Sequence, residues 1–462
     1  MFQAWGRTAD HGGNGGPTRL RDLWQRDPGY PKGEKSPGGT PLPFRRVLLF
    51  FVPLALFSCA TLSQPTPKTT VLELRGQGEG PPTKPVPPLQ PPDLESGLFY
   101  APPLSPINEE SRQRIRMLMT KLSRREKIAQ QFITWIPRNF QVSDLEKLKE
   151  LKPGGYILYP WNYGSIQDVR ALTGALLDVE PLRADFPWEW RETIRPFICA
   201  DQEGGRVAAF RFKEFALPPA AFALGSLAEG PLVEESAYST ALELRYLGLN
   251  MNLAPVADLY PQGDSTIIGD RSFGNDPATV ATLVSAYIRG LRRGGIIGTL
   301  KHFPGHGITT VDSHSKLPVV NADAKALETR ELVPFSAGIR SGAPVVMTAH
   351  ILYPAIDPER PATLSPTILG TLLRKELGFG GIILTDGFEM GALSNTYGKS
   401  EALADAFNAG INMILLYSRY DLSDMIDRVE TLVQQHSIDI RVIDRNVETI
   451  LLVKEAYRLI DR

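Results

Sequence analysis

The most informative stretch of this chain is Lys301-His302-Phe303-Pro304-Gly305-His306-Gly307, followed by Asp312-Ser313-His314. It comes directly after an apolar run, Gly295–Leu300, that is typical of a short buried strand. Three of the chain's six histidines lie between positions 302 and 314. Gly305 and Gly307 permit tight backbone turns that side chains would obstruct. A buried strand followed by Lys, His, a glycine-rich loop, Asp and His suits an active site better than a hydrophobic core.

The rest of the chain from residue 106 alternates apolar runs of strand length with amphipathic helical stretches. The strand candidates are Ala129–Trp135, Gly155–Tyr159, Pro196–Ala200, Leu249–Val256, Gly295–Leu300, Val345–Ala349, Gly381–Thr385 and Ile411–Tyr417. The helical candidates are Asn108–Leu122, Ile166–Leu177, Val233–Leu247, Pro277–Arg293, Ala324–Ser341, Pro366–Leu377, Lys399–Ala409, Met425–Leu432 and Val442–Ile460. Asp276-Pro277 and Ser365-Pro366 are typical pairs for starting a helix. This order predicts a single (β/α)₈ barrel domain, of the TIM type, over 106–462. A doubly wound open sheet is the alternative.

Polar residues directly follow five of the apolar runs. They are Asp201, Asp258, Lys301-His302, His350 and Asp386. The carboxyl ends of barrel strands form one rim, so in a barrel these side chains would converge on one pocket, whereas in an open sheet they would spread along an edge. A single pocket lined by so many polar side chains favours the barrel.

The N-terminal 105 residues have a different composition. Residues 1–44 are rich in Gly, Pro and Arg, and Arg45-Arg46 then precedes about eleven apolar residues that end at Ser58-Cys59, a pattern that predicts a secretory signal. Leu56-Phe57-Ser58-Cys59 resembles a bacterial lipobox, which predicts lipidation of Cys59. Residues 60–105 are rich in proline and are expected to form a stiff linker. We therefore expect an exported lipoprotein at the periplasmic or outer face of a bacterial membrane, attached through its lipid alone.

Composition excludes several classes of function. The formal net charge of −1 favours neither nucleic acid nor another polyanion as a partner. Two cysteines, Cys59 and Cys199, are too few for a disulfide framework, and Cys199 lies in an apolar run. No phosphate-binding or dinucleotide-binding motif is present, so no cofactor is expected. His302 and His306 are four residues apart, but Pro304 between them breaks the helix that would align them on a metal, and we expect no metal site.

The residues at the predicted rim suggest sugar chemistry. Asp386 follows an apolar strand, a setting in which a carboxylate can attack an electrophilic carbon. Asp312 and His314 are two apart in the chain, and an ionised Asp beside a His favours the imidazolium needed for acid/base catalysis. A nucleophilic Asp with a His acid/base is consistent with retaining glycoside cleavage, in which a second carboxylate is the usual acid. The remaining polar residues suit hydroxyl recognition: Asp201 as acceptor, Arg271 as a planar fork, and Lys301 and His302 as donors.

Five motifs in this order resemble glycoside hydrolase family 3, in its β-N-acetylhexosaminidase branch. They are Asp201-Gln-Glu-Gly-Gly-Arg-Val207, Gly269-Asp-Arg-Ser-Phe-Gly274, Lys301-His-Phe-Pro-Gly-His-Gly307, Asp312-Ser-His314 and Thr385-Asp386. The resemblance covers about 110–460 and implies a barrel fold. It also implies that Asp386 is the nucleophile, that His314 is the acid/base polarised by Asp312, and that Asp201, Arg271, Lys301 and His302 hold N-acetylglucosamine. Where related enzymes usually carry a further sugar-binding Arg, this chain has Ala209, with Arg211 two residues on.

The sequence therefore predicts a retaining exo-β-N-acetylglucosaminidase acting on peptidoglycan-derived or chitin-type glycans. Two alternatives stay open. Phosphate could replace water as the acceptor, because a His acid/base lacks the negative charge that repels phosphate. The chain could also be a surface sugar-binding protein without activity, for which the absence of an Arg at Ala209 is the only indication.

Overall fold

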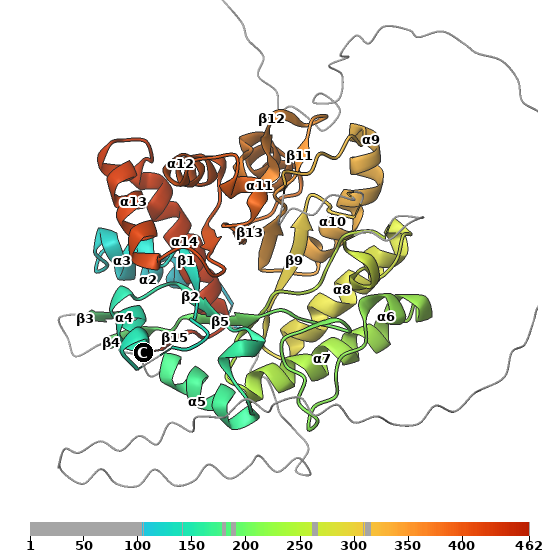
Figure 1. Cartoon of the computed structure of the whole chain (residues 1–462), viewed down its shortest axis with the longest axis horizontal. Helices are drawn as coiled ribbons and strands as arrows, with labels where there is room; N and C mark the ends of the chain where they lie inside the picture. Colours follow the sequence, from blue (N-terminus) through green and yellow to red (C-terminus); the bar gives the residue numbers. More distant parts are fainter. Residues whose placement is uncertain are drawn as a thin grey trace, which may run out of the picture. The chain divides into compact units, whose positions relative to one another are not determined.

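Eight parallel strands form a closed barrel (Figure 1). They are β1 (Phe132–Trp135), β2 (Gly155–Ile157), β5 (Phe197–Ala200), β8 (Met251–Asn252), β9 (Ile297–Phe303), β10 (Val345–Thr348), β13 (Ile382–Gly387) and β14 (Met413–Leu415). Their order around the barrel is β1-β14-β13-β10-β9-β8-β5-β2, and β2 pairs with β1 to complete the circle. Each strand coincides with one of the eight predicted runs, although β9 and β13 continue beyond the predicted ends at Leu300 and Thr385. The predicted (β/α)₈ barrel is confirmed, and a doubly wound open sheet is ruled out because the sheet has no edge.

The computed structural model describes residues 104, 106–140, 142–177, 182–185, 191–260, 267–307, 309 and 316–461, and all structural statements below concern these. They belong to one compact unit. The predicted leader, signal and lipidation site at Cys59 lie outside the described residues, as does the linker except for Leu104. Asp312 and His314 lie outside them too. No helix in the described part of the chain has both the length and the apolar character needed to cross a bilayer.

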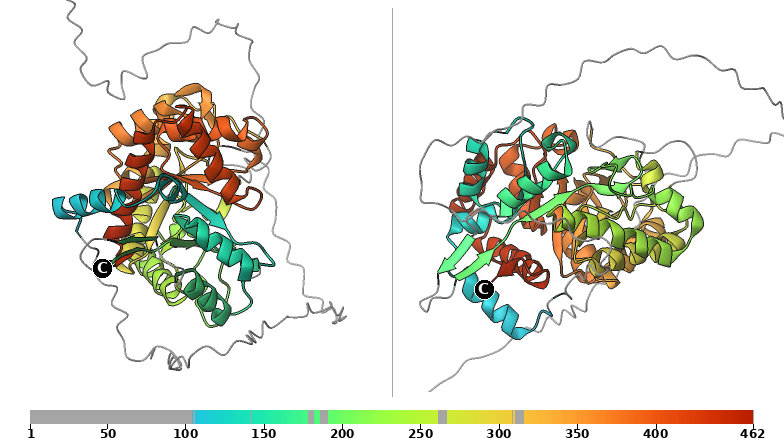
Figure 2. Two further views of the ribbon diagram at one scale, coloured as in Figure 1. Left: turned by 90° about the vertical axis from the view of Figure 1, so that its left-hand side faces the viewer. Right: turned by 90° about the horizontal axis from the view of Figure 1, so that it is seen from below.

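Helices surround the barrel (Figures 1 and 2). The α-helices are α2 (Glu109–Met119), α3 (Arg124–Ala129), α4 (Val142–Leu151), α5 (Ile166–Leu177), α6 (Ala221–Leu227), α7 (Gly230–Tyr246), α8 (Pro277–Arg293), α9 (Ala324–Ala326), α10 (Leu332–Arg340), α11 (Gly391–Ser394), α12 (Lys399–Ala409), α13 (Leu422–Gln434) and α14 (Ile440–Ala456). Two π-helical segments, η3 (Leu327–Glu331) and η5 (Thr367–Glu376), occur where continuous α-helix was predicted. Three short 3₁₀ turns complete the helical elements: η1 (Pro160–Asn162), η2 (Gly269–Arg271) and η4 (Ala362–Leu364).

Two predicted helix starts are confirmed by their hydrogen bonds. The Asp276 carboxylate accepts from the Thr279 amide at 2.8 Å, and the Ser365 hydroxyl accepts from the Ile368 amide at 3.1 Å. Such side chains satisfy backbone donors that have no partner within the first turn. Val442–Ile460, predicted as one helix, is wrong at its end, because the chain leaves α14 and forms β15 (Ile460–Asp461).

Short strands outside the barrel add three small sheets. β15 pairs with β4 (Arg191–Ile194), which pairs with β3 (Leu182–Asp185). β6 (Gln202–Gly204) with β7 (Val207–Ala208), and β11 (Leu352–Tyr353) with β12 (Asp357–Pro361), form two antiparallel pairs. None of these was predicted, because strands this short carry too few residues for a periodic pattern.

The barrel interior is filled by alternate residues of the strands. In β2 and the two residues that follow it, Tyr156 and Leu158 pack outward with the helices, whereas Ile157 and Tyr159 belong to the inner cluster. Cys199 lies in the same inner cluster and is a buried free thiol. Side chains alternate between the two faces of a strand, so the inner residues stack in layers, with the topmost layer at the carboxyl ends of the strands.

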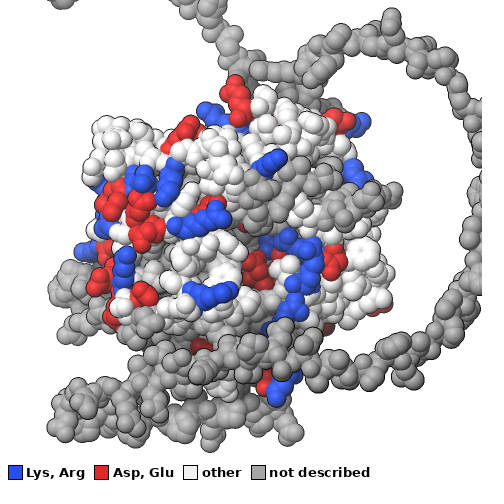
Figure 3. All heavy atoms as spheres, viewed as in Figure 1, with Lys and Arg blue, Asp and Glu red and all other residues white. Residues whose placement is uncertain are grey.

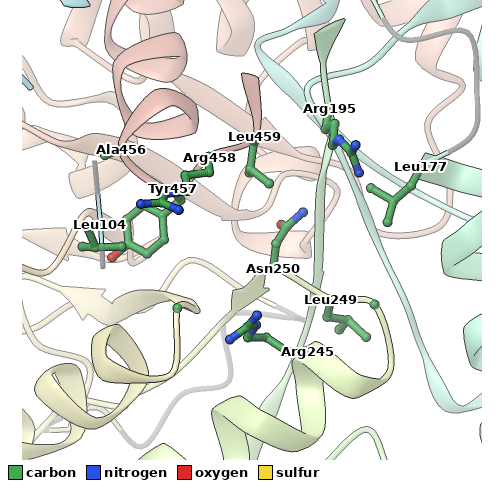
Figure 4. A pocket seen from close by; sticks show the side chains of 12 residues that line it. Leu104, Leu177, Arg195, Arg245, Leu249, Asn250, Ala456, Tyr457, Arg458 and Leu459 are labelled. Atoms are coloured by element: carbon green, nitrogen blue, oxygen red, sulfur yellow. The ribbon is translucent and has the colours of Figure 1, made fainter. Parts of the chain in front are cut away.

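A hollow lies at the amino-terminal end of the barrel, away from the strand ends that carry the polar residues (Figure 4). Its lining includes Arg195, Asn250 and Gly295, which lie one or two residues before the first residues of β5, β8 and β9. The amino-terminal end of a barrel serves mainly stability. This hollow is therefore separate from the polar rim.

Candidate active site

The glycine-rich stretch has the tight geometry that the sequence predicts. Gly305 has φ of +139°, and a Cβ on Gly307 would lie 1.8 Å from the Leu259 carbonyl oxygen. Lys301 and His302, predicted to follow their strand, lie within it, because β9 continues to Phe303. The strand itself therefore holds both side chains in place at the rim.

Lys301 is at the centre of a buried cluster of charges. Its ammonium contacts Asp201 Oδ1 and Glu203 Oε1, each at 2.6 Å, and the residue is 2% exposed. Arg271 binds the same Glu203 through two parallel hydrogen bonds of 2.8 Å. Burial opposes ionisation of Glu203, but Arg271 and Lys301 outweigh it and lower its pKa to about 2. Glu203 therefore holds both cations in position, which leaves Asp201, with a side chain 34% exposed, facing outward.

His302 is oriented by a buried carboxylate, Asp258. Asp258 accepts the His302 Nδ1 at 2.7 Å, and it also accepts the backbone amides of His302 and His306. Burial opposes ionisation of Asp258, but the His302 ring and these partners outweigh it, so its pKa lies below the usual range. An ionised carboxylate can only accept, so Nδ1 carries a proton and Nε2 points to Asp386 Oδ2, 4.0 Å away.

Asp386 lies in β13, with its side chain 24% exposed. Burial opposes its ionisation, but His302, the Gly387 amide and Lys301 are among the groups that outweigh burial and lower its pKa to about 2. The Gly387 amide donates to Oδ1 at 2.7 Å. Asp386 is consequently a carboxylate at neutral pH, partly open to solvent, which is the state a nucleophile requires.

His350 supports the backbone beside Asp386. Its Nε2 donates to the Gly387 carbonyl at 3.1 Å, and its Nδ1 lies 2.7 Å from the Thr363 hydroxyl. Burial lowers the pKa of His350, so the ring is neutral and Nδ1 accepts from Thr363. The sequence identified His350 as a rim residue but assigned it no role.

Glu389 holds the loop that follows β14. Its carboxylate accepts four consecutive backbone amides, from Tyr417, Ser418, Arg419 and Tyr420, at 2.6 to 3.2 Å. This set of bonds fixes the position of Tyr417 at the rim. The sequence identified Asp258 as a rim residue without a role, and it assigned no role to Glu389 or Glu203, because the partners of all three lie far away in the chain.

The structure brings together Asp201, Arg271, Lys301, His302 and Asp386, the five predicted residues that it describes. Ala209, where an Arg was expected, contributes its carbonyl oxygen to the Tyr163 hydroxyl. Arg211 donates to the Gly205 carbonyl at 2.7 Å and is exposed. No group of three or more His, Cys, Asp or Glu in the described residues is arranged to hold a metal ion. Over the face drawn in Figure 3, acidic and basic side chains are interspersed.

A closed (β/α)₈ barrel whose rim carries an ionised Asp beside a buried cluster of paired charges is consistent with the class of barrel glycoside hydrolases. The chain belongs to glycoside hydrolase family 3, whose model, described as the glycosyl hydrolase family 3 N terminal domain, matches residues 124–453.

Curated relatives agree with this assignment. The chain is 38% identical over 268 residues to a "Beta-hexosaminidase" of Stenotrophomonas maltophilia (strain R551-3), which covers 57% of this chain and 75% of that protein. A "Beta-hexosaminidase" of Methylococcus capsulatus is 39% identical over 267 residues, with the same shares covered.

Solved structures share the fold. The glycoside hydrolase family 3 β-N-acetylglucosaminidase from Paenibacillus sp. str. FPU-7 has a TM-score of 0.66 at 34% identity, covering 73% of this chain and 63% of that chain. The β-N-acetylhexosaminidase from Beutenbergia cavernae DSM 12333 has a TM-score of 0.62 at 27% identity, covering 72% of this chain and 98% of that chain.

Proposed function

We propose that this chain is a retaining exo-β-N-acetylglucosaminidase that removes terminal N-acetylglucosamine from peptidoglycan-derived or chitin-type glycans. The single observation that carries the proposal is the position of Asp386, ionised at the barrel rim and 4.0 Å from the His302 ring. The names of the relatives, β-hexosaminidase and β-N-acetylglucosaminidase, support the acetamido sugar as the cleaved unit.

The first step forms a covalent intermediate. Asp386 attacks the anomeric carbon, the bond to the leaving-group oxygen breaks, and the His314 imidazolium gives its proton to that oxygen. In the second step neutral His314 takes a proton from water, whose oxygen attacks the anomeric carbon and releases Asp386. Asp312 favours the imidazolium that begins each cycle. Two inversions at one carbon leave the product with the β configuration of the substrate.

The charged cluster would hold the sugar during both steps. The Asp201 side chain is 34% exposed and His302 Nε2 lies beside Asp386, while Lys301 and Arg271 are held by Glu203. Because these groups are positioned before the substrate arrives, binding does not have to order them. A rigid set of donors and acceptors suits hydroxyl groups, which supply both.

The proposal extends to the location of the enzyme. Arg45-Arg46, the apolar run and Cys59 support export and a lipid anchor on the outer or periplasmic face of a membrane. A catalytic unit on a proline-rich linker would then meet glycans outside the cytoplasm.

The test follows release of nitrophenol from 4-nitrophenyl β-N-acetylglucosaminide by the purified chain, with the β-glucoside as control. Cleavage of the acetamido sugar with little cleavage of the glucoside supports the proposal, and proton NMR should show the β-anomer appearing first. An α-anomeric first product, or no cleavage by folded protein, would overturn it. Phosphate is varied in the same assay, because a sugar phosphate product would identify phosphorolysis.

A further inference from the structure

The topmost inward-facing residues of the barrel divide into two arcs. Alternate residues of a strand point inward, so Asp201 lies above the inner residue Cys199, and Asp386 lies above Leu384. Strand β9 contributes Lys301 to the same level. These charged side chains come from β5, β9 and β13, within the arc β5-β8-β9-β10-β13. On the three remaining strands, β14, β1 and β2, the corresponding residues are aromatic: Tyr417, Trp135 and Tyr159.

These three residues and Trp161 make up what we term the aromatic arc. β2 and β14 both pair with β1, so Tyr417, Trp135 and Tyr159 come from neighbouring strand ends, and Trp161 lies in η1, which follows β2. The Tyr159 ring stacks on Trp161, with centroids 4.4 Å apart and planes at 23°. The edge of Tyr159 also meets Tyr417 at 5.2 Å. Trp135 Nε1 donates to the Tyr420 carbonyl at 3.4 Å, which ties β1 to the loop held by Glu389.

Tyr417 is the exposed member of the arc. Tyr417 is 40% exposed, whereas Tyr159, whose ring edge packs against it, is 8% exposed. Burial raises the pKa of the Tyr417 phenol, and Asp201, Glu389 and Asp386 raise it further. Tyr417 lies at the boundary of the two arcs, because it follows β14, which pairs with β13, and a Cβ on Gly387, the residue after Asp386, would lie 3.5 Å from the Tyr417 Cβ. A large aromatic residue held rigidly in a solvent-accessible position makes a binding surface that loses little entropy on contact.

We propose that the aromatic arc is the subsite for the sugar ring on the leaving-group side of the scissile bond, with Tyr417 as its exposed face. The inference rests on the proposed function, in which the charged arc holds the cleaved sugar. The leaving group must then extend to the side that the charged arc does not occupy. A β-linked pyranose presents an apolar face of C–H bonds, which packs on an aromatic ring, and hydroxyls at its edge, which remain accessible to water.

The test compares substrates that differ only in the leaving group. N,N′-diacetylchitobiose carries a second sugar ring, methyl β-N-acetylglucosaminide carries none, and hexyl β-N-acetylglucosaminide carries an apolar chain. We expect Tyr417→Ala to lower kcat/KM for the disaccharide about tenfold more than for the methyl glycoside, the size of one stacked ring. Tyr417→Phe, which keeps the ring, should retain the preference for the disaccharide.

The matched control is Tyr238→Ala. Tyr238 is a half-buried ring on the outer helix α7, with the Arg293 guanidinium 3.9 Å from its centroid. Its removal should leave the ratio of the two kcat/KM values unchanged. The inference would be overturned if Tyr417→Ala lost equal activity on both substrates, which leaves the ratio of their kcat/KM values unchanged. A stronger preference for the hexyl than for the disaccharide substrate would also overturn it.

Binding separates this inference from the proposed function. In Asp386→Ala, calorimetric titration should show the disaccharide binding more tightly than N-acetylglucosamine, and the advantage should be lost when Tyr417→Ala is added. If the wild-type chain cleaves none of the three substrates but this preference is observed, the proposed function fails and the subsite stands. If cleavage is observed without any preference, the subsite fails alone. If neither sugar binds, the inference is overturned.

Discussion

Glu203→Gln should destabilise the protein more than most single substitutions do. Glu203 binds Lys301 at 2.6 Å and Arg271 through two bonds of 2.8 Å, in a site closed to water. Its pKa of about 2, against an ordinary 4.5, corresponds to roughly 3 kcal/mol of net interaction favouring the carboxylate. The amide loses that interaction and leaves Arg271 without a buried counter-charge, so we expect a loss of about 3 kcal/mol of unfolding free energy.

Urea unfolding followed by circular dichroism measures this loss as a lower midpoint. The matched control is Glu235→Gln, because Glu235 pairs with Arg293 at 2.6 Å on the surface, where water screens the pair. The control should unfold at the wild-type midpoint. The ionised Glu203 contributes its full share of the free energy of unfolding above pH 4.5, the pKa of the unfolded state. That contribution is lost as the pH falls through about 2, the pKa of the folded state. The difference between wild type and Glu203→Gln should therefore shrink below pH 4.5. Equal midpoints for Glu203→Gln and wild type at pH 7 would refute the reasoning.

Four further predictions concern the site and the anchor. Asp386→Ala should abolish turnover while calorimetry still detects N-acetylglucosamine binding; near-normal turnover would remove it as nucleophile. His314→Ala should slow alkyl glycosides far more than nitrophenyl glycosides, because a good leaving group needs little protonation, and equal losses would exclude the acid role. Gly307→Ala places a Cβ 1.8 Å from the Leu259 oxygen and should lower the melting temperature, with a cost of about 1–3 kcal/mol; an unchanged melting temperature would contradict this. Cys59→Ser should move the protein from the membrane to the soluble fraction, and unchanged partitioning would argue against lipidation.

The barrel could be predicted because its signals are local. Each strand is a short apolar run, each helix carries its own periodic apolar face, and caps such as Asp276 act within one turn. The predicted bounds of α5, α8 and α12 match those in the structure. The π-helical segment η5 could not be distinguished from an α-helix, since both bury Ile368, Leu369 and Leu372 on one side.

Much of the candidate site was predictable for a related reason. Once the chain is taken as a barrel, the residues at the strand ends must meet at one rim, which placed Asp201, Lys301, His302 and Asp386 together. Arg271 comes instead from a loop, and its assignment depended on a motif resemblance. His314 and Asp312, which lie outside the described residues, stay predictions.

The sequence by itself determined the element order, the strand-end side chains and the glycine-rich turn, because these depend on residues within a few positions of one another. Only the tertiary structure decided which charges pair. Glu203 meets Lys301 and Arg271, Asp258 meets His302, and Glu389 meets the backbone of residues 417–420, and each pair joins segments that are 28 or more residues apart. Ion pairs and hydrogen bonds depend on distances within a few ångström, which barrel closure sets and no local pattern records.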